Sequence, residues 1–261
     1  MDGLNCIIKT EDITKEYFRI KKIPELILHP FRKDSLSALD NINIKIKKSE
    51  LVCLLGLNEA GKTTLLKILC GILSPTRGRI FIDGIQINNL LALKARIGFA
   101  SGDERSFYWR LTAKENLEFF GTLYGMDPRY LRKRAIDLFS LFDIRNPNRR
   151  FYEYSSGMKQ RFCIIRALLH NPEVILLDEP MKNLDYISRK KLLNLIKHEL
   201  VGRQRKTIVM SVCSLENIDM YDKLLVLDKG RIKAQGDAGD IKGISNLADL
   251  DIEEIIKRLC G

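Results

Sequence analysis

Hydrophobic and polar residues alternate in the first part of the chain, as they do in strands with one buried face. The alternation is clearest in Ile42-Asn-Ile-Lys-Ile46, and the unbroken apolar run Leu51-Val-Cys-Leu-Leu55 follows it. Both patterns predict β-strands. Residues 4–18 and 38–55 are therefore expected to be rich in strands.

Farther along, apolar side chains recur at the spacing of a helix. Leu65, Leu66, Ile68 and Leu69 have this spacing, which predicts a helix that begins at Lys62. The pattern further predicts a short hairpin at 79–84, helices through 112–170 and at 187–200, and strands at 174–177, 207–210, 224–227 and 231–234. Strands that alternate with helices predict an α/β fold, with a mostly parallel sheet covered on both faces.

The composition fits one large domain. A chain of 261 residues is within the size of about 250–300 residues that a single core serves. Apolar residues make up 45% of the chain and charged residues 30%, which is ordinary for a globular protein. No apolar run approaches the roughly 20 residues that span a bilayer, and the acidic start is unlike a secretion signal, so we expect a cytoplasmic chain.

The net charge and the cysteines say little about the function. The formal net charge is +11, which suits nucleic acid, the anionic inner leaflet of a membrane, or solubility alone. The six cysteines are scattered without metal-binding spacing, so we expect reduced thiols that mostly fill the core. The motifs along the chain have to decide the function.

The segment Gly56-Leu-Asn-Glu-Ala-Gly-Lys-Thr-Thr64 matches the Walker A pattern of a phosphate-binding loop. A predicted strand precedes it and a predicted helix follows it, which is the context that this motif requires. In such loops backbone N–H groups point at the anion, Lys62 reaches the β- and γ-phosphates, and Thr63 binds Mg²⁺. Because backbone donors hold the anion, we expect Glu59 to point to solvent.

Two acids end a predicted buried strand, in Val174-Ile-Leu-Leu-Asp178-Glu179. This is the Walker B pattern, and it predicts Asp178 beside the Mg²⁺ of the phosphate loop. Glu179 is suited to orient the water that attacks a phosphate. Just upstream, Ser155 is a good helix N-cap in Tyr154-Ser-Ser-Gly-Met-Lys-Gln-Arg161. Taken locally, an ordinary capped helix explains that segment as well as anion binding does.

Together these segments resemble the nucleotide-binding subunit of ATP-binding cassette (ABC) transporters. Residues 154–161 resemble the signature motif of that family, which stands just before Walker B. Asn183-Leu-Asp185 resembles its D-loop, and residues 11–17 resemble the opening strand whose aromatic residue stacks on adenine. The resemblance covers about residues 7–235, and the joint order of Walker A, signature and Walker B is highly specific.

The resemblance implies a P-loop NTPase fold of the RecA-like type. Its mostly parallel core would carry an N-terminal antiparallel β subdomain and a helical signature subdomain at about residues 103–170. The ATPase domain would occupy residues 1–235, and residues 236–261 would form a short C-terminal tail.

The resemblance also implies a head-to-tail dimer with two ATP molecules and Mg²⁺ at the interface. Each ATP would lie between Walker A of one subunit and the signature of the other, with Glu179 and Lys62 as catalytic residues. Stacking of Tyr17 on adenine would contribute roughly 1–3 kcal/mol, as base–aromatic contacts do elsewhere. The residues expected to bind ATP are Tyr17, Gly56, Asn58, Gly61, Lys62, Thr63, Thr64, Ser155, Gly157, Asp185 and Cys213, and the expected metal ligands are Thr63 and Asp178.

The chain departs from the family pattern at two places. Most members have a Gln in the stretch that corresponds to residues 97–112, which has none here; Gly102 or Asp103 is nearest, and Asp103 or Glu104 offers an oxygen ligand. Where the family has a His that contacts the γ-phosphate and the catalytic Glu, this chain has Cys213. A thiol is a weak donor, so we expect slow hydrolysis with nucleotide binding intact. Alternatively, Cys213 is a small buried residue at a strand end.

We therefore expect the ATPase subunit of a bacterial exporter, peripheral on the inner face of the membrane, with a transmembrane permease and a second cassette as partners. Homodimer and heterodimer stay open. The exporter branch rests on the resemblance of the aromatic and basic run at 106–112 and of the insert at 19–36, which either contacts the membrane or is a solvated loop. The alternatives are a soluble cassette acting on nucleic acid or ribosomes and a non-hydrolysing regulator; without a nucleic-acid module, we expect no specific nucleic acid.

Overall fold

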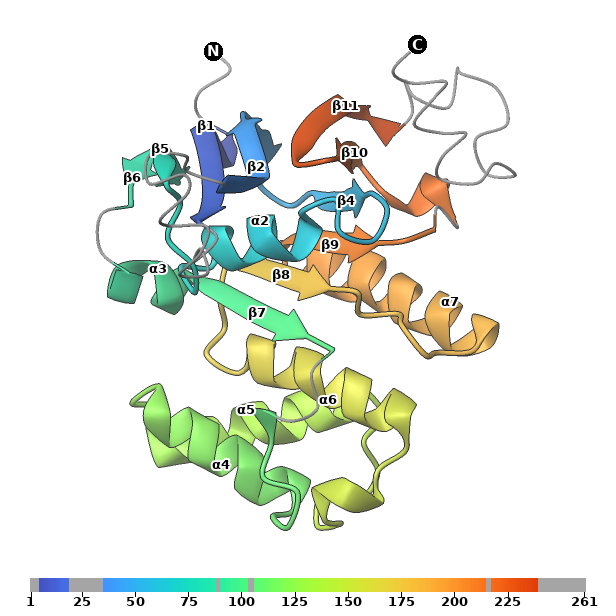
Figure 1. Ribbon diagram of the computed structural model, residues 1–261. Coiled ribbons are helices and arrows are strands. Elements are labelled where there is room, and N and C mark those ends of the chain that lie inside the picture. The colour runs from blue at the N-terminus through green and yellow to red at the C-terminus, as the bar shows by residue number, and fades with distance from the viewer. Residues whose placement is uncertain (1–4, 19–34, 88–89, 103–105, 215–216, 239–261) are drawn as a thin grey trace, which may run out of the picture.

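The computed structural model describes residues 5–18, 35–87, 90–102, 106–214 and 217–238. An N-terminal sheet lies above helix α2 (Lys62–Leu69), much of a second sheet lies below this helix, and a group of helices lies below the second sheet (Figure 1). Most of the insert at 19–36, and the tail beyond Ala238, lie outside these residues.

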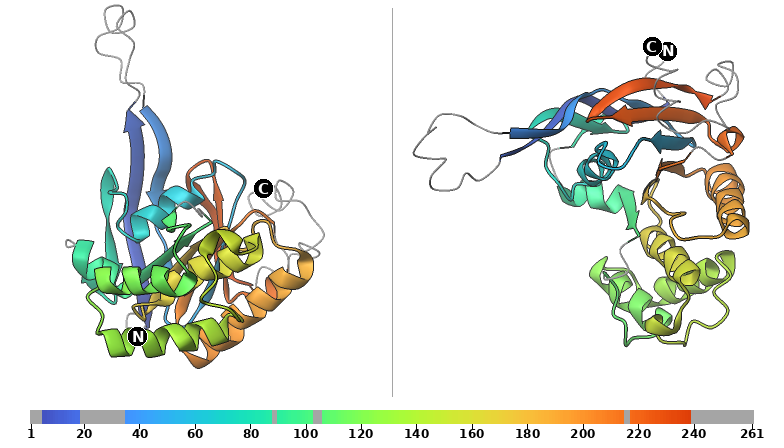
Figure 2. Two further views of the ribbon diagram at one scale, coloured as in Figure 1. Left: turned by 90° about the horizontal axis from the view of Figure 1, so that it is seen from below. Right: turned by 45° about the vertical axis from the view of Figure 1, so that its right-hand side comes forward.

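The first sheet is antiparallel and contains most of the N-terminal strands. Its order is β2-β1-β5-β6, and β3 also pairs with β1. The predicted hairpin near residues 79–84 is confirmed as β5 and β6. β1 and β2 run side by side and project beyond the other strands (Figure 2). The strands are β1 (Cys6–Phe18), β2 (Ser35–Ile42), β3 (Lys45–Lys47), β5 (Arg77–Ile82) and β6 (Ile85–Gln86).

The second sheet is mostly parallel, as the sequence predicts. Its order is β11-β10-β4-β9-β8-β7, and every pairing except β10 with β11 is parallel. The last strand continues to Asp237, and the next residue, Ala238, is buried. The strands are β4 (Leu51–Leu55), β7 (Ile97–Ser101), β8 (Val174–Asp178), β9 (Thr207–Val212), β10 (Lys223–Asp228) and β11 (Arg231–Asp237).

Helices cover the parallel sheet on both sides. α2 lies on the side of the antiparallel sheet, α6 and α7 lie on the other side, and α4 and α5 form the layer farthest from the antiparallel sheet (Figures 1 and 2). None of the helices in the described part of the chain is long and apolar enough to cross a bilayer. The helices are α2 (Lys62–Leu69), α3 (Leu90–Arg96), α4 (Ala113–Leu123), α5 (Pro128–Leu141), α6 (Ser156–Leu168) and α7 (Tyr186–Asn194), which continues in π-helical turns over Leu195–Arg203.

Four of these helices begin at a side chain that accepts a hydrogen bond from the first turn. Thr112 caps α4, Asp127 caps α5, Ser155 caps α6 and Asp185 caps α7. The caps pair backbone N–H groups that have no partner within the helix. Ser155 thus marks the start of α6, the helix that contains residues 156–161 of the signature segment.

The central strand β4 shows why the sheet needs cover on both faces. Leu51, Cys53 and Leu55 pack with the helices of the lower layer, whereas Val52 and Leu54 pack with α2 and the antiparallel sheet. Successive side chains of a strand point to opposite faces, so a strand buried on both faces reads as an unbroken apolar run. The unbroken run of β4 thus follows from its central place.

Packing of β7 against α6 generates a stability prediction. A Cβ atom at Gly98 in β7 would clash with the backbone carbonyl of Ala167 in α6, and backbone atoms cannot rotate away. We expect Gly98→Ala to lower the free energy of unfolding by about 1–3 kcal/mol, measured by urea denaturation.

The matched control is Gly202→Ala in the helical segment after α7, where the added Cβ lies 3.4 Å from the carbonyl O of Lys197. Alanine is favoured over glycine inside helices by roughly 0.5–1 kcal/mol, so the control should be neutral or stabilising. Equal effects of the two substitutions would contradict the packing argument.

Candidate functional site

The phosphate loop follows β4 and surrounds a cavity of about 160 Å³. Two glycines permit its path. A Cβ atom at Gly56 would clash with the carbonyl O of Leu227. Gly61 has φ +106°, and a Cβ atom there would lie 2.7 Å from the carbonyl O of Ala38, which is also a clash. A side chain at either position would push the loop out of its place. Leu57, Asn58, Glu59, Gly61, Lys62, Thr63 and Thr64 all line the cavity.

Lys62 and Glu59 take opposite positions in this loop. Lys62 is only 5% exposed, and its Nζ donates to the carbonyl oxygens of Gly56 at 2.7 Å and Leu57 at 2.9 Å. Glu59 is exposed, with φ 65°. The loop thus holds a cation inside while its acid lies at the surface.

Asp178 at the end of β8 is joined to the loop by hydrogen bonds. Its Oδ2 accepts from Thr63 Oγ1 at 2.7 Å, and its Oδ1 accepts from Ser211 Oγ at 2.7 Å. The Ser211 hydroxyl also accepts from the backbone N–H of Glu179 at 2.8 Å. Asp178 and Thr63 offer the oxygen ligands that Mg²⁺ prefers, so the residues at this point fit that ion.

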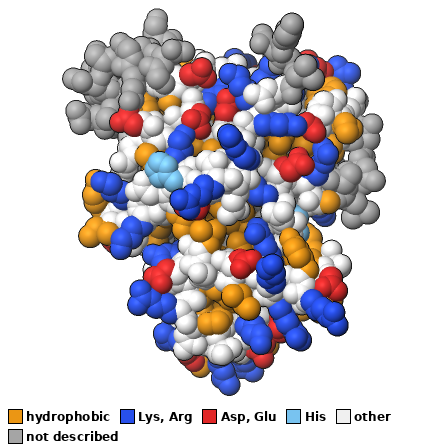
Figure 3. Space-filling model, turned by 180° about the vertical axis from the view of Figure 1, so that it is seen from behind, with side chains coloured by type: hydrophobic (Ala, Val, Ile, Leu, Met, Phe, Trp, Pro, Cys, Tyr) orange, Lys and Arg blue, Asp and Glu red, His pale blue; other side chains and the backbone are white. Residues whose placement is uncertain are grey.

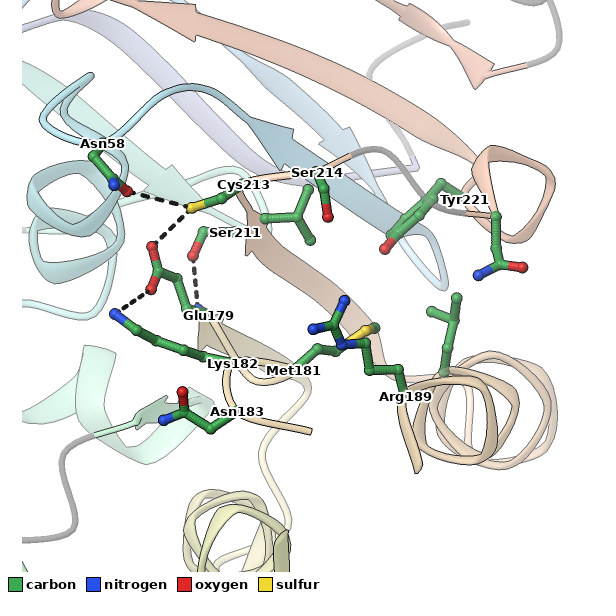
Figure 4. Close-up of a pocket in the computed structure, with 13 residues that line it drawn as sticks. Asn58, Glu179, Met181, Lys182, Asn183, Arg189, Ser211, Cys213, Ser214 and Tyr221 are labelled. Carbon is green, nitrogen blue, oxygen red and sulfur yellow. Dashed lines mark hydrogen bonds and ion pairs between the residues drawn. The ribbon is translucent and has the colours of Figure 1, made fainter. Parts of the chain in front are cut away.

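The Glu179 carboxylate has a different partner on each oxygen. Cys213 Sγ donates to Oε1 at 3.0 Å, and Lys182 Nζ lies 3.1 Å from Oε2 (Figure 4). The hydrogen bond from Cys213, together with Lys182, holds the pKa of Glu179 below its usual value. Glu179 is therefore a carboxylate near neutral pH, as an acceptor of protons has to be.

Cys213 follows β9 and lies between the loop and Glu179. Besides its contact with Glu179, its Sγ is 3.4 Å from Lys62 Nζ and 3.5 Å from Asn58 Oδ1. Partial desolvation of the sulfur, with the hydrogen bond to Glu179, raises the pKa of this thiol, so it is neutral at physiological pH. The residue is exposed. The alternative that Cys213 is a small buried residue is therefore wrong.

A larger cavity of about 310 Å³ continues from Glu179 and Cys213 toward α7 (Figure 4). Lys182 borders it on one side, and Arg189 and Tyr221 border it on the other. Glu179 thus lines both this cavity and the phosphate cavity.

The signature residues lie in a separate cavity of about 270 Å³. Ser155, Gly157 and Asp185 line it, and none of its lining residues lines the phosphate cavity. Asp185 is engaged in capping α7, because it accepts from the N–H and the hydroxyl of Ser188. Within one chain these three residues are therefore not part of the phosphate site.

Tyr17 lies on β1 and is 43% exposed. It pairs with Leu36 on β2, and Ala38, two residues farther along β2, lines the phosphate cavity. The tyrosine is thus on the strand pair that borders the loop, although it does not line the cavity. Of the residues near the missing Gln, Gly102 ends the described stretch, and Asp103 and Glu104 lie outside it.

Sequence reasoning missed three polar residues around Glu179. Ser211 is fully buried in β9 and bridges Asp178 and Glu179, and Gln160 of α6 is buried with its Nε2 3.5 Å from the carbonyl O of Glu179. Lys182 pairs with the Glu179 side chain. A polar residue inside the apolar strand Thr207–Val212 was the available signal for Ser211.

Comparison with known proteins gives a consistent result. The family model described as ABC transporter matches residues 39–182. The ABC transporter ATP-binding protein NatA of Bacillus subtilis is 36% identical over 208 residues, which are 78% of this chain and 84% of NatA. The bacitracin transport ATP-binding protein BcrA of Bacillus licheniformis is 34% identical over 233 residues, which are 88% of this chain and 69% of BcrA. The solved dimer of the ATP-binding cassette MJ0796 in a post-hydrolysis state, bound to ADP and Pi, matches 89% of this chain and 99% of its own at 28% identity, with a TM-score of 0.74.

The matched range contains the phosphate loop, the signature segment and both acids of the Walker B strand. The two sheets and the helical layer correspond to those of solved ABC cassettes, which confirms the expected P-loop NTPase fold. With its family model and its relatives in agreement, the chain belongs to the ATP-binding proteins of ABC transporters.

Proposed function

We propose that this chain binds and hydrolyses ATP as a subunit of an ABC exporter, and drives export through a separate membrane subunit. The observation that carries the proposal is the hydrogen-bonded group at the phosphate loop, in which Thr63 and Ser211 hold Asp178 and Ser211 holds the backbone of Glu179. A solved cassette that the chain resembles is bound to ADP and Pi, which supports ATP as the nucleotide.

Each side chain of the group has a task that suits its chemistry. Lys62 would turn from the loop carbonyls to the β- and γ-phosphates, while the backbone N–H groups of the loop hold the other phosphate oxygens. Thr63 and Asp178 would hold Mg²⁺, which when bound neutralises negative charge on the phosphates. Glu179 would orient the attacking water and accept its proton. Tyr17 would stack on the adenine ring.

The cavity at the signature helix supports a head-to-tail dimer. Ser155, Gly157 and Asp185 do not line the phosphate cavity of their own chain, so a second cassette would bring its copies of them to this site. The α6 N-terminus carries partial positive charge, which suits a γ-phosphate. Either a second copy of this chain or a different cassette would complete the pair.

The partner in the membrane is a permease, and the chain would lie in the cytoplasm on the inner face of the membrane. Relatives named as transport ATP-binding proteins support this arrangement. The direction of transport rests on the resemblance of residues 106–112 to exporter cassettes. The ATPase domain expected at residues 1–235 would extend through the end of β11 to the buried Ala238, with the helical subdomain at about 103–170 and the residues after Ala238 as a tail.

The net charge of +11 does not by itself favour nucleic acid. On the face seen in Figure 3, basic side chains are spread over the molecule and acidic ones lie among them. A nucleic-acid site concentrates Lys and Arg in one patch or stripe. This face therefore shows no concentrated basic patch of the kind that binds nucleic acid.

Hydrolysis by the purified chain tests the catalytic assignment. We expect slow Mg²⁺-dependent release of phosphate from ATP, and we expect Glu179→Gln to lower kcat by roughly a hundredfold or more, because the amide cannot accept a proton. ATP affinity, measured with a fluorescent nucleotide, should stay nearly unchanged. Cys213→His should raise kcat if the thiol limits the rate.

The matched control is Glu173→Gln, an exposed acid just before the other end of β8, which should leave kcat unchanged. Full activity of Glu179→Gln would remove Glu179 from the mechanism. An unchanged kcat of Cys213→His would show that the thiol is not what limits hydrolysis.

Purification from the native membrane tests the partner. A tagged copy extracted in mild detergent should bring down a multi-spanning protein in stoichiometric amount, and a second cassette if the pair is a heterodimer. Inside-out vesicles that contain the complex should take up its cargo when ATP is added outside. Recovery with ribosomes or nucleic acid and no membrane protein would overturn the transporter assignment.

A further inference from the structure

The turn after β8 places a lysine against the carboxylate of Glu179. Glu179 has φ 49°, Pro180 follows it, and the N–H of Lys182 donates to the carbonyl O of Glu179 at 3.1 Å. This closes a tight turn, in which residues three apart lie side by side. The Lys182 Nζ consequently lies 3.1 Å from Glu179 Oε2 (Figure 4).

The two contacts of the carboxylate are unequal. The Cys213 thiol donates to Oε1 at 3.0 Å, but a thiol is a weak and neutral donor. The ammonium of Lys182 on Oε2 is charged, and charge-assisted hydrogen bonds are about twice as strong as neutral ones. Lys182 therefore supplies the charged one of these two contacts to Glu179.

Two other cations border the same cavities and have other contacts. Lys62 Nζ donates to the carbonyl oxygens of Gly56 and Leu57 in the phosphate loop. Arg189 Nε donates to the carbonyl O of Leu184. The positive charge directly on the Glu179 carboxylate thus comes from Lys182.

The position of Lys182 also lets it respond to the phosphate site. Glu179 lines both cavities, and Lys182 lines the larger one. The side chain of Lys182 is 65% exposed, so its flexible stem can follow the carboxylate as that group approaches a water beside the phosphate. Because exposed ion pairs contribute little to folding, substitutions of Lys182 should leave the chain folded.

We propose that Lys182 is a positioning residue for hydrolysis, which holds the Glu179 carboxylate in one orientation at the border of the two cavities and supplies the positive charge that the neutral thiol of Cys213 lacks. The inference rests on the proposed ATPase function and adds a residue with no role in it so far. It concerns a side chain on the turn of this chain, and it is independent of the membrane partner.

Three variants of the full-length protein test the proposal by steady-state hydrolysis of ATP with Mg²⁺. Lys182→Met keeps the length of the side chain and removes its charge, and should lower kcat roughly ten- to a hundredfold, as a misplaced catalytic group does. KM for ATP and the affinity for nucleotide should change by less than about twofold, because ground-state binding is not affected. Lys182→Arg should recover most of kcat, and Lys190→Met, an exposed lysine of α7, should behave as wild type.

A second measurement asks whether Lys182 and Cys213 act on the same carboxylate. Residues that share a partner are not additive, so Cys213→His should raise kcat by a larger factor in the Lys182→Met background than in the wild type. Equal factors in the two backgrounds would mean independent action and would overturn the proposal.

The other outcomes are equally decisive. An unchanged or higher kcat of Lys182→Met overturns the proposal, and a higher value would mean that the ion pair restrains Glu179. A loss of nucleotide affinity in step with kcat would indicate a structural role instead. A wild type that binds ATP without hydrolysing it, like Glu179→Gln, would overturn the ATPase function together with this inference, whereas an active wild type with an unaffected Lys182→Met overturns this inference alone.

Discussion

The parallel pairing of β4, β9 and β8 is the constraint on which the site depends. Leu55 of β4 lies opposite Val212 of β9, and Leu177 of β8 lies opposite Met210, so the three strands end at the same edge of the sheet. The phosphate loop, Cys213 and the two acids leave the sheet there as neighbours. Ligands of open α/β sheets bind at the carboxyl ends of the strands for this reason. A shift of one strand by a single residue would turn Ser211 away from Asp178.

Much of this arrangement follows from the sequence, because the signals are local. The phosphate loop is a contiguous segment between an apolar strand and a helix, and the strand Val174–Asp178 ends in acids, so both could be placed by pattern alone. Ser211 and Lys182 could not. The role of Ser211 depends on which strands are neighbours, and that of Lys182 depends on a turn whose φ values no apolar pattern encodes. The exposure of Cys213 likewise depends on tertiary structure, because a cysteine just after an apolar strand can be either buried or exposed.

The separation of the two polar cavities has a physical cause in helix capping. Ser155 uses its side chain to accept from the N–H of Met158, and Asp185 caps α7 in the same way. These side chains cap their own helices, and both helix N-termini border one cavity that shares no lining residue with the phosphate cavity. A helix N-terminus attracts anions through its partial positive charge, so this cavity suits a phosphate. A phosphate bound at the phosphate loop of the same chain would lie in a different cavity. In the proposed head-to-tail dimer, a second nucleotide-loaded cassette would supply that phosphate.

The charges around the loop explain how acids coexist with a site for polyanions. Glu59 is exposed and costs the site little, because main-chain donors hold the anion. Glu179 differs in its exposure: both acids line the phosphate cavity, but Glu179 is only partly exposed, and a bare carboxylate there would repel a phosphate. Lys62, held by the carbonyls of its own loop, lines the same cavity and balances this negative charge, whereas Lys182 contacts the carboxylate of Glu179 from outside the phosphate cavity. In the proposed ATP-bound state Lys62 would leave the loop oxygens, because a phosphate oxygen is a stronger acceptor than a carbonyl. The positive charge that stays beside Glu179 would then be that of Lys182 on the turn.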